Sequence, residues 1–561
     1  MVDSVKQTRF LQIVLTISLI FIGTFHEYLS CAVSLTILVF IIVKVVQGNS
    51  IRFRINISSI AILTLILFYM LSCFWAIDSG MAFIGFLKFL PVFLYLLMLM
   101  QQDKKDDIIE KLPYIATIMT IIATLGAQIP VFETFFSVSG RLAGFFQYPN
   151  TFALFLLVSE LIVISKTKLS VIDIMIMIIL IFGLIYTGSR TVFVLSIISN
   201  LILLFYGKSR RVKLVVVISA FIAVFVAAIY LLLSGNETVF SRIVEISPNE
   251  STFIGRWLYF FDALPVVLRN PFGLGYMGYY YVQQSIQSGV YSVMYIHNDF
   301  LQILLDVGWI PFLMFAVAII KSVFSRKIDF YKKVILVTIS LHCCFDFNLQ
   351  FIAMFFIFLL FMDFDAGKEI VLTKNKVAVN TVSLFLASVC LYGGIALSLS
   401  RFGQHSAANK IYPWNTKNET NLLVYEKNID KANQIADDII SRNEYVSLAY
   451  SVKARYAYSQ GDFAQVIKYK NLLFEKAPFA YDEYEEYCYM LVNGISLYTS
   501  VADEYSINIC KNELMKVKNN VENIEKRLSK FGAMIDDQPV KSLPDELKVY
   551  IETLEGDNDE K

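Results

Sequence analysis

The chain of 561 residues is 57% hydrophobic and has a mean hydropathy of +0.60, which excludes an ordinary soluble domain and indicates a polytopic membrane protein. Its formal net charge of +1 carries little information, because an apolar region of about 400 residues is followed by a polar one. The predicted fold class is therefore all-α: a membrane helix bundle with a helical domain after it.

Apolar windows long enough to cross a ~30 Å hydrocarbon layer recur along the first 400 positions. No small-residue cleavage site follows the first window, so we expect a retained helix rather than a signal peptide. The sequence predicts thirteen spans: 10–24, 29–47, 56–76, 82–100, 113–130, 151–165, 170–187, 191–206, 212–234, 299–320, 331–345, 348–363 and 377–399.

Positive charge orients these spans. Lys and Arg cluster before the first span and in every even-numbered connection, as in "GKSRRVK" (207–213), whereas the odd-numbered connections are poor in Lys. By the positive-inside rule this pattern places the N-terminus in the cytoplasm of a multi-pass protein of the cytoplasmic membrane. An odd number of spans then places residues 401–561 outside the cytoplasm.

The polar tail is rich in Glu, Lys, Asn and Tyr and predicts an extracytoplasmic helical domain. Its segment "YSVKARYAYSQGDFAQVIKYKNLLFEKAP" resembles a tetratricopeptide (TPR) helix pair, with a Gly-Asp turn and a closing Ala-Pro. We find one convincing copy, and both a helical hairpin and a true repeat array stay open. Cys488 and Cys510 lie in this tail and could pair, but their spacing fits no metal motif.

Four arginine or histidine residues in predicted external loops are informative exceptions to the charge rule. They are Arg141 in "SGRLAGFFQYPN", Arg190 in the tight hairpin "YTGSRTVF", Arg256 in the 64-residue connection 235–298, and His297 at its end. Arginine binds phosphate through two parallel N–H donors and keeps its proton when desolvated. The set therefore predicts a site for a lipid-carried pyrophosphate. The alternative for any single arginine is snorkelling to the lipid headgroups.

Helical phase favours a site for Arg256. If 253–264 is helical, Phe253, Phe260 and Ala263 share its face, whereas Asp262 lies more than 100° away. Arg256 thus projects from an apolar face and needs a partner that its own helix does not supply.

His297 precedes the tenth span, with Asn298 or Asp299 as the expected helix cap. A neutral imidazole there could accept a proton from a sugar hydroxyl; the alternative is a solvated loop histidine. Tyr276, in the glycine-rich "NPFGLGYMGYYY" (270–281), could stack on a sugar ring or sit in an interfacial aromatic belt. Charges inside predicted spans are candidate functional residues by default: Lys88, Glu160 and Asp306.

The motifs "GRLAGFFQYPN", "TGSR", "GRWLYFFDALPVVLRNPFGLGY" and "HNDFLQILLDVGW" resemble, in order and spacing, those of the bacterial O-antigen ligase and Wzy-type polymerase superfamily. The resemblance covers roughly residues 140–320. It implies a metal-independent, cofactor-independent membrane glycosyltransferase of the C type that takes a glycan from undecaprenyl pyrophosphate at the outer membrane face. The chain departs from the family pattern at Asp306, where a glutamate is expected.

The resemblance also assigns roles. His297 would assist the acceptor hydroxyl, while Arg190 and Arg256 would hold the pyrophosphate, which makes these three the candidate catalytic residues. The candidate substrate-binding residues are Arg141, Tyr276, Asp306 and Lys88. No Asp-x-Asp occurs in the long external loop, and "DFD" (363–365) falls on the cytoplasmic side, so a metal-dependent sugar-nucleotide enzyme is disfavoured. Displacement at the anomeric carbon with inversion is the expected reaction.

The expected domains are N-terminal helices (1–140), a ligase-like catalytic region (141–320), C-terminal membrane helices (321–400) and the tail (401–561). Three products are possible: a polymerised glycan, a glycan ligated to a lipid, and a glycan moved to a protein. Richness in Ile, Lys, Asn and Tyr indicates an AT-rich genome and favours capsule or exopolysaccharide polymerisation. The expected partners are therefore the lipid-linked donor, a glycan, lipid or protein acceptor and the membrane, without nucleic acid. A flippase or a non-catalytic assembly scaffold is the alternative of another class.

Overall fold

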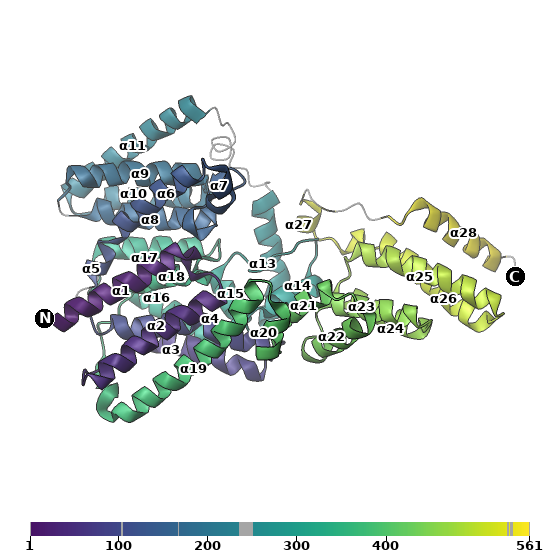
Figure 1. Ribbon diagram of the computed structural model, residues 1–561. Helices are drawn as coiled ribbons and strands as arrows, with labels where there is room; N and C mark the ends of the chain where they lie inside the picture. Colours follow the sequence, from purple (N-terminus) through teal and green to yellow (C-terminus); the bar gives the residue numbers. More distant parts are fainter. Residues whose placement is uncertain are drawn as a thin grey trace.

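The computed structural model describes residues 2–102, 105–166, 168–234, 251–535, 538 and 542–559. The N-terminal part of the chain forms a bundle of long helices, and a tail of shorter helices extends from one end of this bundle (Figure 1). The two termini therefore lie far apart. We call the end of the bundle near Arg401, where the tail begins, the tail end. The first part of the predicted external connection, residues 235–250, lies outside the described residues.

Each predicted span coincides with helix. Six helical segments are long and apolar enough to cross a membrane, within the described residues, and four shorter helices are apolar as well. A multi-pass protein is thus confirmed, and the number of thirteen spans stays a prediction. The corresponding helices are α1 (Val2–Ile20), α2 (Glu27–Val46), α3 (Ile57–Leu71), α4 (Ser79–Leu99), α6 (Leu112–Gly126), α8 (Pro149–Ser165), α9 (Val171–Thr187), α10 (Arg190–Tyr206), α11 (Arg210–Ser234), α15 (Asp299–Val307), α16 (Trp309–Phe324), α17 (Phe330–Cys343), α18 (Ile352–Leu360) and α19 (Lys376–Arg401).

The tenth predicted span is two helices, α15 and α16, rather than one. The chain breaks at Gly308, where φ is +80° and an added Cβ would lie 2.2 Å from the Pro271 carbonyl oxygen. The glycine-rich segment binds at this break: Leu274 N and Gly275 N donate to the carbonyls of Leu305 and Asp306, at 2.6 and 2.9 Å. Backbone hydrogen bonds between distant segments therefore replace those that a continuous helix would make.

Short elements connect the bundle helices. At the tail end these are α7 (Pro130–Phe136), the hairpin β2 (Ser137–Val138) and β3 (Arg141–Leu142), α13 (Ser251–Arg269), α14 (Gly278–Ile286) and the 3-10 turns η1 (Ile22–Thr24), η2 (Ser72–Phe74), η3 (Gly144–Phe146) and η4 (Asn348–Gln350). The helix α13 continues through Pro265 and stands between the bundle and the tail (Figure 1).

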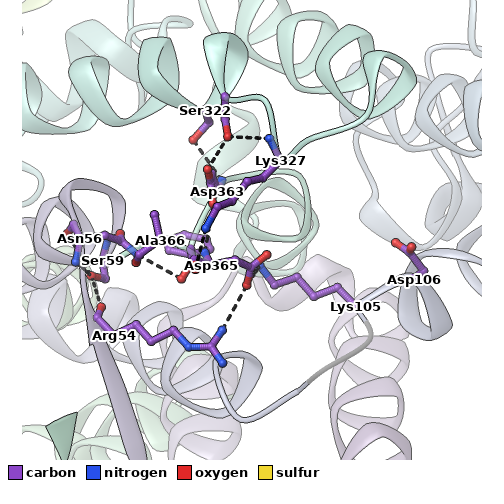
Figure 2. Close-up of polar contacts among 12 residues, drawn as sticks. Arg54, Asn56, Ser59, Lys105, Asp106, Ser322, Lys327, Asp363, Asp365 and Ala366 are labelled. Atoms are coloured by element: carbon purple, nitrogen blue, oxygen red, sulfur yellow. Dashed lines mark hydrogen bonds and ion pairs between the residues drawn. The ribbon is translucent and has the colours of Figure 1, made fainter. Parts of the chain in front are cut away.

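The opposite end of the bundle is closed by a two-stranded antiparallel sheet. In this sheet β1 (Arg52–Ile55) pairs with β4 (Lys368–Val371), beside α5 (Asp106–Ile109) and η5 (Leu372–Asn375). Asp365 lies 3.3 Å from Arg54 Nη1 and 3.4 Å from Lys105 Nζ, and Asn56 Nδ2 donates to the Phe364 and Ala366 carbonyls (Figure 2). The "DFD" segment therefore belongs to a structural ion-pair cluster.

The tail is a series of packed helices. It comprises α20 (His405–Ile411), α21 (Thr416–Tyr425), α22 (Ile429–Arg442), α23 (Ser447–Ser459), α24 (Phe463–Lys476), α25 (Tyr481–Ser500), α26 (Glu504–Glu522), η6 (Glu525–Arg527), α27 (Lys530–Ala533) and α28 (Asp545–Asp559). The pair α23–α24 is the segment that resembles a TPR unit, and α25–α26 forms a second hairpin. Cys488 and Cys510 are both buried free thiols. A repeat array stays a prediction.

Candidate active site

A cavity of about 650 Å³ opens at the tail end of the bundle. The four candidate residues of the predicted external loops all line it: Arg141, Arg190, Arg256 and His297. They come from four separate segments, and the fold brings them to one place. The lining residues that the structure describes include no carboxylate, so the cavity wall is cationic.

Arg190 owes its position to the tight turn between α9 and α10. Gly188 ends α9 in the left-handed conformation, with φ at +56°, and Arg190 is the first residue of α10. Free N–H groups and the positive end of the helix dipole add to its charge there. Arg141 fixes the neighbouring loop, because its Nε donates to the Thr187 carbonyl at 2.8 Å and its Nη2 to Asn150 Oδ1 at 2.7 Å.

Arg256 projects from α13, as the helical phase predicts, and finds its partner on another segment. Its Nη2 lies 3.5 Å from Asp346 Oδ2. Asp262, on the same helix, instead accepts hydrogen bonds from the backbone and hydroxyl of Ser288 and from the Tyr291 hydroxyl. Asp262 thereby ties α13 to the loop that leads to His297.

His297 is oriented by the same aspartate. Its Nδ1 lies 3.2 Å from Asp346 Oδ1, its φ is +55°, and its ring makes an edge contact with Phe347, with centroids 4.9 Å apart. Asn298 is the cap of α15, since its side chain accepts a hydrogen bond from Leu301 N at 3.0 Å, which confirms one of the two expected caps.

Asp346 is the organising residue of the cluster, and it is not among the residues predicted from the sequence. Its side chain is only 2% exposed. It also accepts hydrogen bonds from Tyr148 Oη and Asn150 Nδ2, both at 2.8 Å. Burial opposes ionisation, but the hydrogen bond from His297 and the charge of Arg256 hold the pKa of Asp346 below its ordinary value.

An ionised Asp346 determines the tautomer of neutral His297. A carboxylate can only accept a hydrogen bond, so the imidazole proton must lie on Nδ1. The Nε2 atom is then the proton acceptor of the ring. An aspartate that orients a histidine in this way is the arrangement by which many enzymes prepare a general base.

The other predicted substrate-binding residues do not line the cavity. Lys88 is fully buried, and its Nζ lies 2.8 Å from Tyr295 Oη and 3.3 Å from Tyr276 Oη. Asp306, also fully buried, accepts hydrogen bonds from Tyr69 at 2.9 Å and Gln302 at 2.8 Å. Their hydrogen-bonding groups are thus paired inside the protein.

A second, apolar cavity of about 520 Å³ lies beside α10, between it, α9 and α11. Ile197 and Leu201 line it, whereas Arg190, Val194 and Ile198 line the cationic cavity. The helix α10 therefore contributes to both cavities. Glu160, at the edge of the apolar one, accepts a hydrogen bond from Ser219 at 2.6 Å.

Residues 175–316 match the family model described as O-antigen ligase. The matched segment contains Arg190, Arg256 and His297, whereas Arg141 and Asp346 lie outside it. No curated protein and no solved structure matches the chain. The match to the family model confirms that this multi-pass membrane protein resembles the O-antigen ligase and Wzy-type polymerase superfamily.

Proposed function

We propose that the protein is a glycosyltransferase that polymerises glycan repeat units carried on undecaprenyl pyrophosphate, at the outer face of the cytoplasmic membrane. The observation that carries this proposal is the cationic cavity, where three arginines meet a histidine already oriented by a buried aspartate. Arginines can bind a pyrophosphate, and an oriented histidine can accept the proton of an attacking hydroxyl. The match to the O-antigen ligase family supports the same reaction class.

The chemistry follows from the residues. The acceptor hydroxyl oxygen attacks the anomeric carbon of the donor sugar, and its proton passes to Nε2 of His297. Asp346 stabilises the imidazolium that forms. The bond between the anomeric carbon and the phosphate oxygen breaks, and the electron pair leaves with the lipid pyrophosphate. Arg190 and Arg256 stabilise the charge that develops on this leaving group. Attack opposite to the leaving group inverts the anomeric centre.

The apolar cavity beside α10 supports a lipid-linked donor. A polyprenyl chain has no polar group beyond its phosphates, so it needs an apolar surface that ends at the anion site. The helix α10 offers both, with Arg190 at its first turn and Ile197 and Leu201 facing the apolar cavity.

The test is product analysis with the purified protein in liposomes, supplied with the undecaprenyl-pyrophosphate-linked repeat unit of the same cell. We expect a ladder of longer lipid-linked chains. The His297→Ala variant should lose about 10²–10⁴-fold in rate, the range for a positioned general base. Full activity in a folded His297→Ala variant would remove the base role. An unchanged donor with the wild-type protein would overturn polymerisation, and transfer to an added lipid or protein acceptor would then be measured.

A further inference from the structure

A third cavity, of about 380 Å³, lies where the tail meets the bundle, and we call it the junction cavity. Its walls come from the start of α2, from α4, from the end of α19 and from the tail helices α20 and α21. None of its lining residues belongs to the cationic cavity. The tail thus contributes side chains to a cavity of the bundle.

The charge of the junction cavity suits an anion. Arg401 and Lys417 line it and are exposed, whereas Glu27 is the one carboxylate among its described lining residues. Glu27 accepts a hydrogen bond from the buried hydroxyl of Tyr276 at 2.7 Å, so part of its charge is already compensated. Burial, together with the charge of Arg401 and against that of Glu27, lowers the pKa of His26 to about 4, so His26 is neutral at pH 7.

The remaining lining suits a sugar. The ring of His26 stacks on Tyr28, with centroids 5.9 Å apart, and His405 stacks on Tyr425 at 6.5 Å. Flat aromatic faces pack well against the C–H faces of a pyranose, and amide side chains such as Asn421 can both donate to and accept from hydroxyl groups. Stacked rings, an amide and two cations together fit an acidic or phosphorylated glycan better than they fit a free inorganic ion.

A series of aromatic contacts leads from this cavity to His297. Phe25, next to His26, packs against Tyr295 and Phe347, with centroids 5.8 and 6.4 Å apart. Phe347 in turn contacts His297. A short chain of ring contacts therefore runs from the residue beside His26, in the junction cavity, to His297 in the cationic cavity.

We propose that the junction cavity binds an anionic segment of the acceptor glycan and so holds its terminal hydroxyl toward His297. This inference rests on the proposed function, because it names the acceptor side of the same reaction. A transferase with two glycan substrates needs two places to hold them. The cationic cavity then holds the donor, and the tail, through α20 and α21, selects the acceptor.

The experiment measures binding rather than turnover. The probe is the repeat unit of the same cell, released from its lipid as the glycosyl phosphate, and titrated calorimetrically into the full chain in nanodiscs. An Arg190→Gln/Arg256→Gln background removes the anion site of the cationic cavity. On that background, we expect the Arg401→Gln/Lys417→Gln pair to weaken binding at least 10-fold, whereas Lys410→Gln, an exposed lysine of α20 outside the cavity, leaves it unchanged.

Three outcomes decide the inference. Equal binding with and without Arg401 and Lys417, or no binding at all, overturns it. If inorganic phosphate binds as tightly as the glycosyl phosphate, the cavity is an anion site and does not recognise a glycan. We also expect the dephosphorylated repeat unit to bind more weakly than the glycosyl phosphate. The third outcome is binding that depends on Arg401 and Lys417 in a protein that makes no longer chains in liposomes. This result would support the glycan site and overturn the proposed polymerase activity. Because Arg401 and Lys417 are exposed, a folding defect is not expected, and Asn421→Ala gives an uncharged second variant.

Discussion

Each end of the helical bundle has an aspartate that meets two basic residues, and the two clusters differ in burial. At the tail end, Asp346 is 2% exposed and lies against His297 and Arg256, both of which line the cationic cavity. At the opposite end, Asp365 is 51% exposed and pairs with Arg54 and Lys105 beside the β1–β4 sheet (Figure 2). The same residue types thus form a buried cluster beside a cavity, the candidate site, in one place and a surface ion-pair cluster in the other.

Burial explains why the consequences differ. Removing one partner of a buried charge leaves the other uncompensated, which is costly, whereas an exposed ion pair contributes only ~0–1 kcal/mol. A cavity beside the buried cluster also lets its basic groups reach a substrate. Substitutions at the two ends should therefore separate catalytic from structural charges.

After the loss expected for His297→Ala, the largest expected effect is that of Arg256→Gln. Glutamine is shorter and still polar, but it lacks the charge that would stabilise the leaving pyrophosphate, so transfer should fall about 10²–10³-fold. Arg269→Gln is the matched control, because Arg269 lies on the same helix and is exposed outside the cavity. Initial rates in liposomes measure both. Similar rates for the two variants would remove Arg256 from the site.

The next effect is that of Asp346→Asn. The amide can donate to Nδ1 of His297, which would move the imidazole proton to Nε2 and block it as a base. We expect roughly a 10-fold or greater loss of rate, as part of the ~10²–10⁴-fold that a positioned base contributes. The KM of the donor should change less than kcat. A variant that loses binding and keeps kcat would contradict this positioning role.

The pH dependence of stability gives an independent reading of Asp346. Its pKa is lower in the folded protein than the ordinary value near 3.9, so the stability it contributes is fully present above pH ~4 and is lost as the pH falls below that value. The difference in thermal midpoint between wild type and Asp346→Asn should therefore shrink as the pH falls from 7 toward 3. A constant difference would show that Asp346 acts through packing alone.

Much of the architecture could be predicted from the sequence, because apolar length and the sidedness of Lys and Arg are local signals. Arg141, Arg190, Arg256 and His297 stood out as exceptions to that sidedness, and the fold brings them to one cavity. Asp346 did not stand out, since acidic residues contribute little to the charge rule. The available signal was an acidic residue in the very short connection between two apolar spans, where no cation neighbours it in sequence.

Other features depend on tertiary contacts and have no local signature. The break at Gly308 is stabilised by hydrogen bonds from the backbone of Leu274 and Gly275 and cannot be distinguished in sequence from a glycine within a membrane helix. The sequence predicts Lys88 and Tyr276 as site residues because charges within membrane spans and aromatic residues in external loops often mark sites. The structure pairs them with each other and with Tyr295, away from the cationic cavity.

The smallest expected effect is that of Asp365→Asn. The exposed carboxylate loses its ion pairs with Arg54 and Lys105, but β1 and β4 stay joined by their backbone hydrogen bonds, and Asn56 still donates to the Phe364 and Ala366 carbonyls. The free energy of unfolding should change by about 1 kcal/mol or less, and transfer by less than 2-fold. Thermal midpoints in detergent and initial rates in liposomes measure the two quantities. A loss of activity as large as that of Asp346→Asn would mean that the opposite end communicates with the site, and burial alone would then fail to distinguish the two clusters.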